Sequence, residues 1–568
     1  MKYLQLCKAY KELEENPSRL KKTEILSEFL KLLKHEKDKE VVYLLKGRIF
    51  PDYDTREVGI STQLAVKAMS KSTGISEKEI IKLWKKTGDL GEIAEEISKK
   101  KRQSSLFSTE LTVKKVLENL QKLPGLEGKG TVDKKMGLIS ELLVSANPLE
   151  TKYIIRTLLS DLRTGTGEGV LRDAIVWACL DKDKKEDFNL VQEAYDITTD
   201  FAEVFEKACK SRQALENLEL SPGKPLKVML AQKAESIADG FKSVGKPAAF
   251  EYKYDGFRML INKDKKGDIK VFTRRLEEVT KQFPEVKEYV KKHVQGNSFI
   301  IDSEAVGFSP KTKKYRPFQE ISQRIKRKYE IEKVQKELPV EINVFDVLYH
   351  DGKSMIKEPF SKRRTLLEKI IKPEKYKLVI AKQIITDNEK EAEKFYHKSL
   401  EEGEEGVMIK SLSSPYKPGA RVGHMLKLKP SANEFDLVIV KAEYGTGKRG
   451  GWLTSYTVAC RRDNEFLEIG KVSTGLKEKA SEGLSFEEVS EKLKKLIKSE
   501  KGREVEVKPE IVITVSYQDI QKSPSYSSGF ALRFPRFTAI REDRSTKDIS
   551  TIEEVERDYE KHWMWRVV

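Results

Sequence analysis

One short segment has the residue types and spacing for covalent chemistry, Glu251-Tyr-Lys-Tyr-Asp-Gly-Phe-Arg258. Lys253 ends a β-rich run and precedes an Asp-Gly turn, which would present its amine on the edge of a rigid element. A lysine becomes a nucleophile only when its pKa falls, through neighbouring cations, a metal ion or desolvation. A surface strand with outward charged side chains would have the same sequence. The segment alone therefore leaves catalysis and surface structure equally open.

A second segment could bind phosphate. Arg163-Thr-Gly-Thr-Gly-Glu-Gly169 places alternating glycines directly before an expected helix at Val170–Leu180. Such glycines expose backbone N–H groups at a helix N-terminus, where an anion is favoured. A plain turn between two helices would look the same, so this segment also leaves two interpretations open.

The overall charge points to a polyanionic partner. The 568 residues include 108 Lys and Arg against 91 Asp and Glu, a net charge of +17. Each phosphate that a protein neutralises releases condensed counterions, so nucleic acid is the obvious partner, although a merely basic soluble protein would have the same balance. We expect a cytoplasmic protein, because the N-terminus becomes charged early and no apolar run is long enough to span a membrane.

The cysteines and histidines predict no metal module. Cys7, Cys179, Cys209 and Cys460 are far apart in the sequence and form no CxxC pair. We therefore expect buried, reduced thiols, with neither a four-cysteine zinc module nor a disulfide framework. The six histidines are scattered too and form no HExxH motif.

The length predicts three or four domains, and the hydrophobic pattern divides the chain into three. Residues 1–218 are expected to form an all-α domain, with helical spacing in Thr23–Leu33, Lys135–Leu143 and Leu149–Leu162. Ser221-Pro-Gly-Lys-Pro225 marks a linker after it.

Residues 219–430 are expected to form an α+β domain built on antiparallel sheets, because short β-rich runs alternate with helical patterns. The expected strands are Ala248–Tyr254, Arg258–Asn262, Ile269–Thr273, Ser298–Ala305, Val340–Val347 and Gly406–Lys410.

Residues 431–568 are expected to form a small β-barrel of the oligonucleotide-binding (OB) type. Strand patterns occur at Phe435–Val440, Ser455–Cys460 and Ile511–Tyr517. A last helix is expected after Ser550 or Thr551, either of which could cap it, with acidic residues in its first turn.

The order of several motifs favours the catalytic interpretation of Lys253. Lys-x-Asp-Gly is motif I of the nucleotidyltransferase superfamily of DNA ligases and mRNA capping enzymes, which the sequence resembles. The later motifs of that superfamily follow in order at Thr273–Arg275, Phe299–Ala305, Asn343–Val347, Glu405–Lys410, Lys427–Lys429 and Arg533–Arg544. Chance could supply one or two of these matches, but not the full ordered set.

The resemblance extends over nearly the whole chain. Lys86–Gly91 and Leu162–Gly169 are similar to segments of the helical DNA-binding domain of archaeal and eukaryotic replicative ligases. Capping enzymes and minimal viral ligases lack that domain. The glycine-rich, basic stretch Gly445–Trp452 resembles the first loop of the ligase OB domain, although an ordinary hairpin loop would look the same.

Residue by residue, the resemblance implies roles around ATP. Lys253 is the nucleophile, Glu251 contacts the adenine and Phe345 stacks on it. Lys427 and Lys429 alternate along an expected strand, which would turn both amines toward the α-phosphate, although a solvated strand face would look the same.

The resemblance also assigns arginines to the nucleotide. Arg258 and Arg274 are implied to lie near the nucleotide or the 5′-phosphate of a nick, and Arg421 matches the arginine that precedes motif V. Arg541 and Arg544 match the contacts of the final motif with pyrophosphate.

Two carboxylates on separate expected strands, Glu304 and Glu405, could hold a ribose hydroxyl or a hydrated Mg²⁺ beside the triphosphate. Taken singly, each could be a surface acid beside a core strand. The chain departs from the family pattern at Met425, where many relatives carry Trp, and at Arg544, where Lys is commoner. Arginine keeps the charge but changes the donor geometry.

The resemblance implies an ATP-dependent DNA ligase that seals nicks in double-stranded DNA during replication, repair and recombination. Its cofactors would be ATP and Mg²⁺, and its intermediates a lysine–AMP adduct and a 5′-adenylated DNA. We expect a monomer, with a sliding clamp as a candidate partner.

Two alternatives stay open at this point. The same catalytic core could serve RNA, in an RNA ligase or a capping enzyme, but the large helical region argues against that. A catalytically inactive DNA-binding or clamp protein could retain the fold, but it would have lost Lys253 or a motif carboxylate, and none is lost.

Overall fold

The computed structural model describes residues 1–568 with the exception of 37–38, 100–109, 129, 317, 326, 328, 431–432, 446–448, 450, 479–483 and 568. Two compact units are present. The first comprises Met1–Gln232, Asp255–Lys382 and Lys410–Leu426, and the second comprises Lys233–Tyr254, Gln383–Ile409 and Lys427–Val568. Among the described residues, no helix is both long and apolar enough to cross a membrane.

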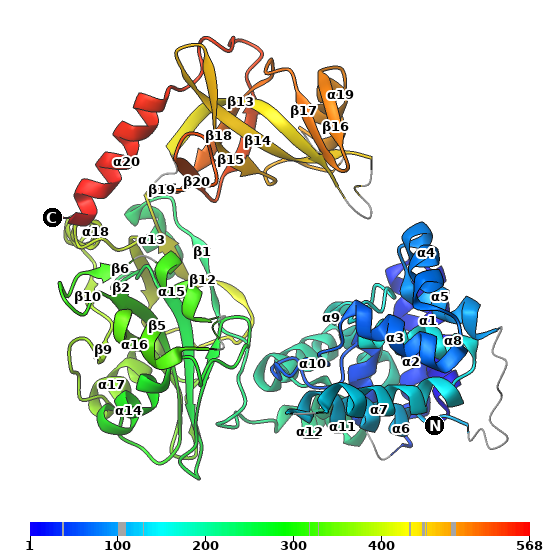
Figure 1. Cartoon of the computed structure of the whole chain (residues 1–568). Coiled ribbons are helices and arrows are strands. Elements are labelled where there is room, and N and C mark those ends of the chain that lie inside the picture. The colour runs from blue at the N-terminus through cyan, green and yellow to red at the C-terminus, as the bar shows by residue number, and fades with distance from the viewer. Residues whose placement is uncertain are drawn as a thin grey trace. The chain divides into compact units, whose positions relative to one another are not determined.

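The N-terminal part of the first unit is helical, as predicted (Figure 1). One continuous apolar core holds these helices together. The helices are α1 (Tyr3–Glu15), α2 (Arg19–Leu33), the 3₁₀ helix η1 (Lys39–Lys46), α3 (Thr62–Thr73), α4 (Glu77–Thr87), α5 (Leu90–Ser98), α6 (Val113–Lys122), the 3₁₀ turn η2 (Leu123–Gly125), α7 (Thr131–Ser145), α8 (Pro148–Leu158), α9 (Glu168–Cys179), α10 (Lys185–Thr198), α11 (Phe201–Lys210) and α12 (Arg212–Glu216).

The helix predicted at Leu149–Leu162 ends four residues earlier than expected. In the structure α8 ends at Leu158, because Ser160 and Arg163 adopt positive φ angles of 55° and 60°. L-residues do not continue a right-handed helix in that conformation. The chain turns there and enters α9 at Glu168.

The rest of the first unit is built on a seven-stranded sheet of order β4-β3-β5-β7-β8, with β6 paired to β5 and β9 to β7. Its pairs are antiparallel, as predicted, except for the parallel pair β7–β9. The strands are β3 (Phe257–Lys263), β4 (Ile269–Thr273), β5 (Phe299–Phe308), β6 (Tyr315–Arg316), β7 (Val340–His350), β8 (Lys353–Ser354) and β9 (Leu378–Ile380).

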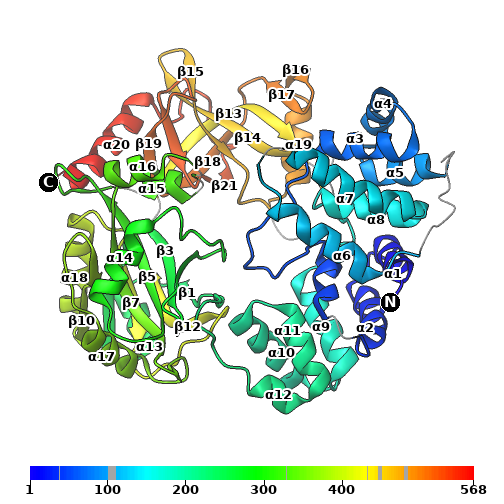
Figure 2. The same ribbon diagram turned by 60° about the horizontal axis from the view of Figure 1, so that its bottom comes forward.

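Four helices accompany this sheet, α14 (Pro284–His293), α15 (Phe318–Ile325), α16 (Ile331–Glu337) and α17 (Phe360–Ile370). Apolar side chains of α14 and α17 share one core with β3, β5 and β7, and Figure 2 shows both helices beside the sheet. A rigid sheet covered in this way can position the side chains of its opposite face.

A second sheet of five strands has the order β1-β12-β11-β2-β10. Helix α18 contacts β2 and β10, and α13 contacts α18. The elements are β1 (Leu230–Lys233), α13 (Ile237–Val244), β2 (Ala248–Tyr252), β10 (Gln383–Thr386), α18 (Glu389–Glu401), β11 (Val407–Ser411) and β12 (Arg421–Leu428).

The C-terminal region is rich in strands and has an apolar core of its own. Its longest strand, β13, pairs with β14, β17 and β18, and β18 pairs with β21. The elements are β13 (Asn433–Tyr444), β14 (Leu453–Arg462), β15 (Glu465–Val472), α19 (Phe486–Lys494), β16 (Ile497–Lys501), β17 (Glu504–Val507), β18 (Val512–Tyr517), β19 (Asp519–Lys522), β20 (Phe530–Arg533), β21 (Arg536–Ile540) and α20 (Ile552–Val567).

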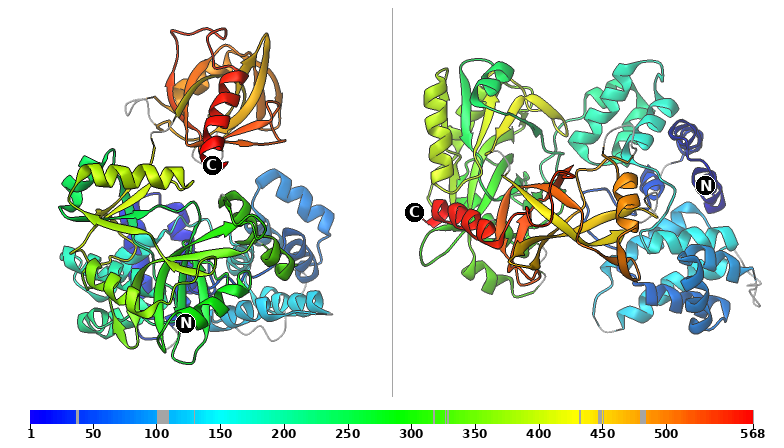
Figure 3. Two further views of the ribbon diagram at one scale, coloured as in Figure 1. Left: turned by 90° about the vertical axis from the view of Figure 1, so that its left-hand side faces the viewer. Right: turned by 90° about the horizontal axis from the view of Figure 1, so that it is seen from above.

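Helix α20 lies beside the C-terminal strands and contacts β14 and β19 (Figure 3). Of the two predicted caps, Thr551 begins it: its hydroxyl accepts from the Glu554 N–H at 3.4 Å, and the Glu554 carboxylate accepts from the Thr551 N–H at 2.9 Å. Half of the predicted loop Gly445–Trp452, residues 446–448 and 450, lies outside the described residues.

Candidate active site

Lys253 lies directly after β2, where the strand gives way to an irregular pairing. The Lys253 N–H donates to the Gly406 carbonyl at 2.8 Å, and the Glu405 N–H donates to the Lys253 carbonyl at 2.8 Å. The prediction that the strand continues to Tyr254 is therefore wrong by two residues, because this pairing replaces the regular ladder. Gly406 has φ 128°, and a Cβ there would lie 2.2 Å from the Leu428 carbonyl oxygen, so only glycine fits.

The Lys253 amine shares one carboxylate oxygen with a second lysine. Nζ of Lys253 lies 2.5 Å from Oε2 of Glu405, and Nζ of Lys429 lies 2.6 Å from the same atom. Burial acts to raise the pKa of Glu405, but the charges of the two lysines outweigh it and lower the pKa to about 2. Desolvation, followed by the charge of Lys253, lowers the pKa of Lys429. The cluster combines two cations with one anion and is therefore suited to receive a phosphate.

The two motif lysines differ in their backbone positions. Lys427 is in β12, whereas Lys429 lies just beyond Leu428, the last residue of that strand. The prediction that both lysines belong to one strand is therefore correct for Lys427 and wrong for Lys429. Both side chains are half-buried.

Glu251 is held on β2 by a cross-strand partner. It lies directly opposite Gln383 of β10, whose amide donates to its carboxylate at 2.9 Å. Glu251 is only 1% exposed, so its orientation is fixed before any ligand arrives.

In the first unit, Arg258 of β3 is anchored by protein groups. Its guanidinium donates to both carboxylate oxygens of Asp302, at 2.9 and 2.5 Å, to the Met229 carbonyl at 2.6 Å and to the Tyr416 hydroxyl at 3.1 Å. Burial opposes the charged form, but Asp302 dominates and raises the pKa of Arg258. Sequence reasoning assigned no role to Asp302 or Tyr416. The sequence around Asp302 and Tyr416 contains no signal that identifies these two residues as the partners of Arg258.

Phe345 is aimed by a β-bulge. In the β5–β7 pairing, Asp302 faces Asp346 and Ser303 faces Val344, so Phe345 is the extra residue on β7. A bulge redirects a side chain at that point, and Phe345 is half-buried while its neighbours in the strand are buried. The Arg258 guanidinium carbon lies 5.4 Å from the ring centroid, and the Lys410 Nζ lies 4.8 Å from it. Such a ring can stack on an aromatic base.

Further cations gather near Arg258. Desolvation and the positive charges of Arg258 and Arg421 lower the pKa of Arg274, while Glu304 acts in the opposite direction. Arg421 donates to the Ala231 carbonyl at 2.8 Å, and Glu304 faces Arg258 across the β3–β5 pair. Mutual repulsion of this kind favours an anion at the site.

Steric crowding explains why the Lys-x-Asp-Gly motif has a glycine at position 256. A Cβ on Gly256 would lie 2.3 Å from the Ala305 carbonyl oxygen of β5. Only glycine therefore allows the chain to enter β3 against β5 at this point.

The two C-terminal arginines share a partner. Arg541 Nη1 lies 3.0 Å and Arg544 Nη1 lies 2.7 Å from Oδ2 of Asp436. Arg541 also donates to both carboxylate oxygens of Asp543, at 2.9 and 2.8 Å. The hydrogen bond to Asp543 raises the pKa of Arg541. Both arginines are thus held in ion pairs, and sequence reasoning did not anticipate Asp436 or Asp543 as partners.

The two helical segments singled out in the sequence are joined by one buried carboxylate. Asp89 caps α5 and accepts from Arg156 at 2.5 Å, and Arg163 lies 3.3 Å from the same oxygen. Arg156 is 2% exposed and also donates to Glu14 of α1. The glycine turn after Arg163 is therefore fixed to the turn before α5.

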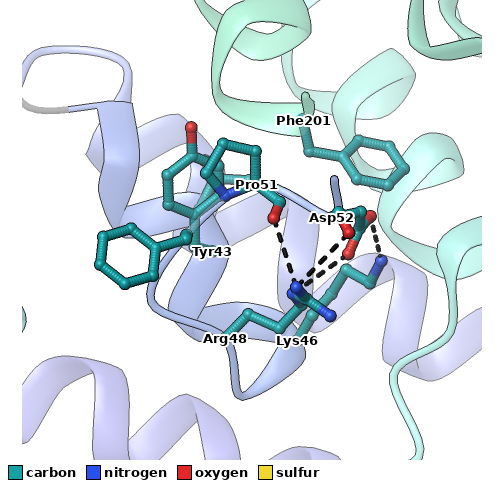
Figure 4. A pocket seen from close by; sticks show the side chains of 8 residues that line it. Tyr43, Lys46, Arg48, Pro51, Asp52 and Phe201 are labelled. Carbon is teal, nitrogen blue, oxygen red and sulfur yellow. Dashed lines mark hydrogen bonds and ion pairs between the residues drawn. The ribbon is translucent and has the colours of Figure 1, made fainter. Parts of the chain in front are cut away.

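A small pocket in the helical region has an ion-paired acid in its lining. Asp52 lies 2.6 Å from Lys46 and 3.4 Å from Arg48 (Figure 4). Its lining is Val42, Tyr43, Lys46, Arg48, Phe50, Pro51, Asp52 and Phe201. Within the described part of the chain, no three His, Cys, Asp or Glu side chains cluster as a ready-made metal site.

Three family models match the chain. They describe the DNA ligase N terminus over residues 2–176, the ATP-dependent DNA ligase domain over 228–429 and the C-terminal region of ATP-dependent DNA ligases over 449–544. A solved structure named Pmar-Lig_PreS3 superimposes with a TM-score of 0.53 at 18% identity, covering 94% of this chain and 99% of its own. That likeness concerns the fold alone.

Curated relatives match over their full length. A DNA ligase of Nanoarchaeum equitans is 45% identical over 99% of this chain and 98% of its own length. A DNA ligase of Thermococcus fumicolans is 43% identical over 98% of both chains. With its ordered motifs, its lysine–carboxylate cluster and these matches, the chain belongs to the ATP-dependent DNA ligase family.

Proposed function

We propose that the chain seals nicks in double-stranded DNA in three steps, with ATP as the source of the adenylyl group. The single observation that carries the proposal is the pair of ammonium groups of Lys253 and Lys429 on one oxygen of Glu405. This cluster offers both a nucleophile and a cationic site for a phosphate that carries developing negative charge.

In the first step, Nζ of Lys253 gives up a proton and attacks the α-phosphorus of ATP. A P–N bond forms, and the P–O bond to pyrophosphate breaks. Lys427 and Lys429 stabilise the charge on the α-phosphate oxygens. Glu251 and Phe345 hold the adenine, the first through its fixed carboxylate and the second by stacking. Arg258, Arg274 and Arg421 supply positive charge for the remaining phosphates.

In the later steps, AMP passes from Lys253 to the 5′-phosphate of the nick, which forms a P–O–P bond as the P–N bond breaks. The adjacent 3′-hydroxyl then attacks the 5′-phosphorus and displaces AMP. The same arginines that face the ATP phosphates can receive the 5′-phosphate, because both ligands present phosphoryl oxygens.

Mg²⁺ fits this site as a partly hydrated ion held by Glu304 and Glu405. Both are hard oxygen donors, Glu304 is half-buried, and the low pKa of Glu405 keeps its carboxylate ionised. An ion bound mainly by water and nucleotide phosphates needs no all-protein cage. When bound, Mg²⁺ supplies electrostatic stabilisation of the phosphoryl oxygens.

The proposed organisation has three domains. Residues 1–218 bind the DNA duplex, residues 219–430 carry out adenylation, and residues 431–568 form an OB-fold domain that brings Arg541 and Arg544 to the pyrophosphate. All these residues come from one chain, so we propose a monomeric enzyme. For an enzyme that acts on DNA we further propose a cytoplasmic location and a sliding clamp as a candidate partner.

A labelling experiment tests the proposal. We expect the full chain to become covalently labelled by α-labelled ATP with Mg²⁺ and to lose that label when a nicked duplex is added, as the strands are joined. γ-Labelled ATP should leave no label, because pyrophosphate departs, and a chelator should stop the reaction. A chain that binds nicked DNA but never acquires the label would instead be an inactive binding protein.

We also expect the helical region to supply much of the DNA affinity. Removal of residues 1–218 should leave self-adenylation intact, weaken nick binding by at least about tenfold and make its salt dependence shallower, because phosphate contacts are lost. Binding measured over a series of salt concentrations checks this. Retained self-adenylation is the control for folding, and equal affinity of the truncated chain would contradict the assigned role.

A further inference from the structure

Two cysteine thiols in the helical region lie against each other and take no part in the proposed reaction. Cys179 is the last residue of α9, and Cys209 is next to the last residue of α11. Their Sγ atoms are 3.4 Å apart. Both side chains are half-buried, whereas Cys7 and Cys460 are buried.

Helix packing, not sequence spacing, creates this pair. The two cysteines are 30 residues apart in the sequence, and the contact between α9 and α11 brings them together. All four cysteines are reduced in the structure, as expected, but the expectation that all are buried is wrong for Cys179 and Cys209, which are half-buried.

The surroundings activate one thiol of the pair. The hydrogen bond from Cys179 lowers the pKa of Cys209 to about 7, and the charges of Lys39 and Lys34 add to that effect against burial. Lys39 is itself fixed, since its Nζ donates to the carbonyls of Leu33 and Lys34 at 3.0 and 2.8 Å. The hydrogen bond with Cys209 and burial raise the pKa of Cys179. Either sulfur can donate this hydrogen bond, and the opposite directions of the two pKa shifts favour Cys209 as the attacking thiolate.

We propose that Cys179 and Cys209 form a redox-active dithiol whose oxidation to a disulfide joins the end of α9 to α11. The oxidant is a low-molecular-weight disulfide. The Cys209 thiolate attacks one sulfur of that oxidant, forms a mixed disulfide and expels one small thiolate. Cys179 then loses its proton, attacks the Cys209 sulfur and expels the second small thiolate. The two protein thiols are oxidised, and their protons and electrons leave with two molecules of small thiol.

The geometry favours closure of the pair. The sulfur atoms need to approach by roughly 1.4 Å to reach bonding distance. Cys179 stands at a helix end, where the chain can adjust more easily than within a helix.

The disulfide would act on the stability of the helical region. The second helix of the pair, α11, begins beside Thr199, whose hydroxyl donates to the Pro225 carbonyl in the predicted linker. A cross-link between α9 and α11 restricts the unfolded chain and so protects this region against heat. Neither cysteine contacts a residue assigned to adenylation, so self-adenylation at moderate temperature should be unchanged.

The test uses the full chain, treated with oxidised glutathione or left reduced, with a chelator present. We expect thiol titration after denaturation to show a loss of two thiols, and mass spectrometry to find a peptide pair linked through Cys179 and Cys209. The mass should fall by two hydrogen atoms with no glutathione retained. The melting temperature should rise by on the order of 5 °C, and reduction should reverse that rise.

Two serine variants separate the proposed steps. Cys179→Ser should leave Cys209 as a stable glutathione adduct with no rise in melting temperature, because the resolving thiol is missing. Cys209→Ser should react much more slowly, because the remaining thiol lacks the activating environment. A wild-type chain that also retains glutathione on Cys209, or that keeps all its thiols under this treatment, would overturn the dithiol proposal. Since self-adenylation is measured in parallel, failure of the proposed ligase function would be recognised separately.

Discussion

Replacement of Lys253 by alanine is expected to reduce formation of the protein–AMP adduct by at least about 10⁴-fold, to the limit of detection. The alanine variant has no amine at this position to form the P–N bond. Its fold should persist, since Glu405 keeps Lys429 as a partner at 2.6 Å and no buried charge is left unpaired. Single-turnover labelling with α-labelled ATP measures the loss, and thermal unfolding checks the fold.

Lys429→Ala is the matched control for this experiment. It removes the other ammonium group from the same oxygen of Glu405 and leaves the Lys253 pair at 2.5 Å. We expect it to slow adenylation by roughly 10²-fold without abolishing it, because electrostatic stabilisation is lost but the nucleophile remains. A Lys253→Ala chain that still accumulates covalent AMP would show that the nucleophile is a different residue.

Arg541→Ala is expected to slow formation of the lysine–AMP adduct by roughly 10²- to 10³-fold while affecting the final sealing step much less. In the proposed reaction, Arg541 stabilises the departing pyrophosphate. No pyrophosphate is present when the nick already carries AMP on its 5′-phosphate. Single-turnover rates on ATP and on a pre-adenylated nick therefore separate the two roles, and equal losses in the two assays would make Arg541 a structural or DNA-contacting residue.

Asp543→Asn gives this prediction a control. Asp543 holds Arg541 through two hydrogen bonds, and the C-terminal region has to exchange that contact for pyrophosphate when it closes over the nucleotide. With a neutral partner, Arg541 should be released more readily, so adenylation should be preserved or faster. Comparable damage from both variants would mean that the pair itself supports the fold.

The broad division into helical and strand-rich regions could be predicted from the sequence, and Lys253 could be selected as the candidate nucleophile. Lys253 stands in a short motif, and the order of the later motifs after it favours its assignment as the nucleophile. The helices and strands are predicted by local hydrophobic periodicity. Element ends were less predictable. The ends of α8 and β2 depend on the positive φ of Ser160 and on the pairing of Lys253 with Gly406, and neither is encoded in local spacing.

Partners across the sheets could not be predicted. The bulge that aims Phe345 exists only in the register between β5 and β7, which is a property of two strands and not of one. The ion pair of Arg258 with Asp302 and the hydrogen bond of Glu251 with Gln383 likewise join residues that are distant in the sequence. The resemblance to ligases identified Arg258 and Glu251 as site residues, whereas their partners become apparent only in the folded structure.

We expect the carboxylate of Glu405 also to make the resting site selective among anions. Because it already neutralises part of the charge on Lys253 and Lys429, an entering anion has to compete with a ligand that is covalently part of the chain. Chloride or a single phosphate brings too little charge and too few contacts to win that competition. A triphosphate that is anchored at the same time through its base can win it. The competition from Glu405 should lower the affinity for the nucleotide somewhat, and it should also keep small anions in solution from occupying the site.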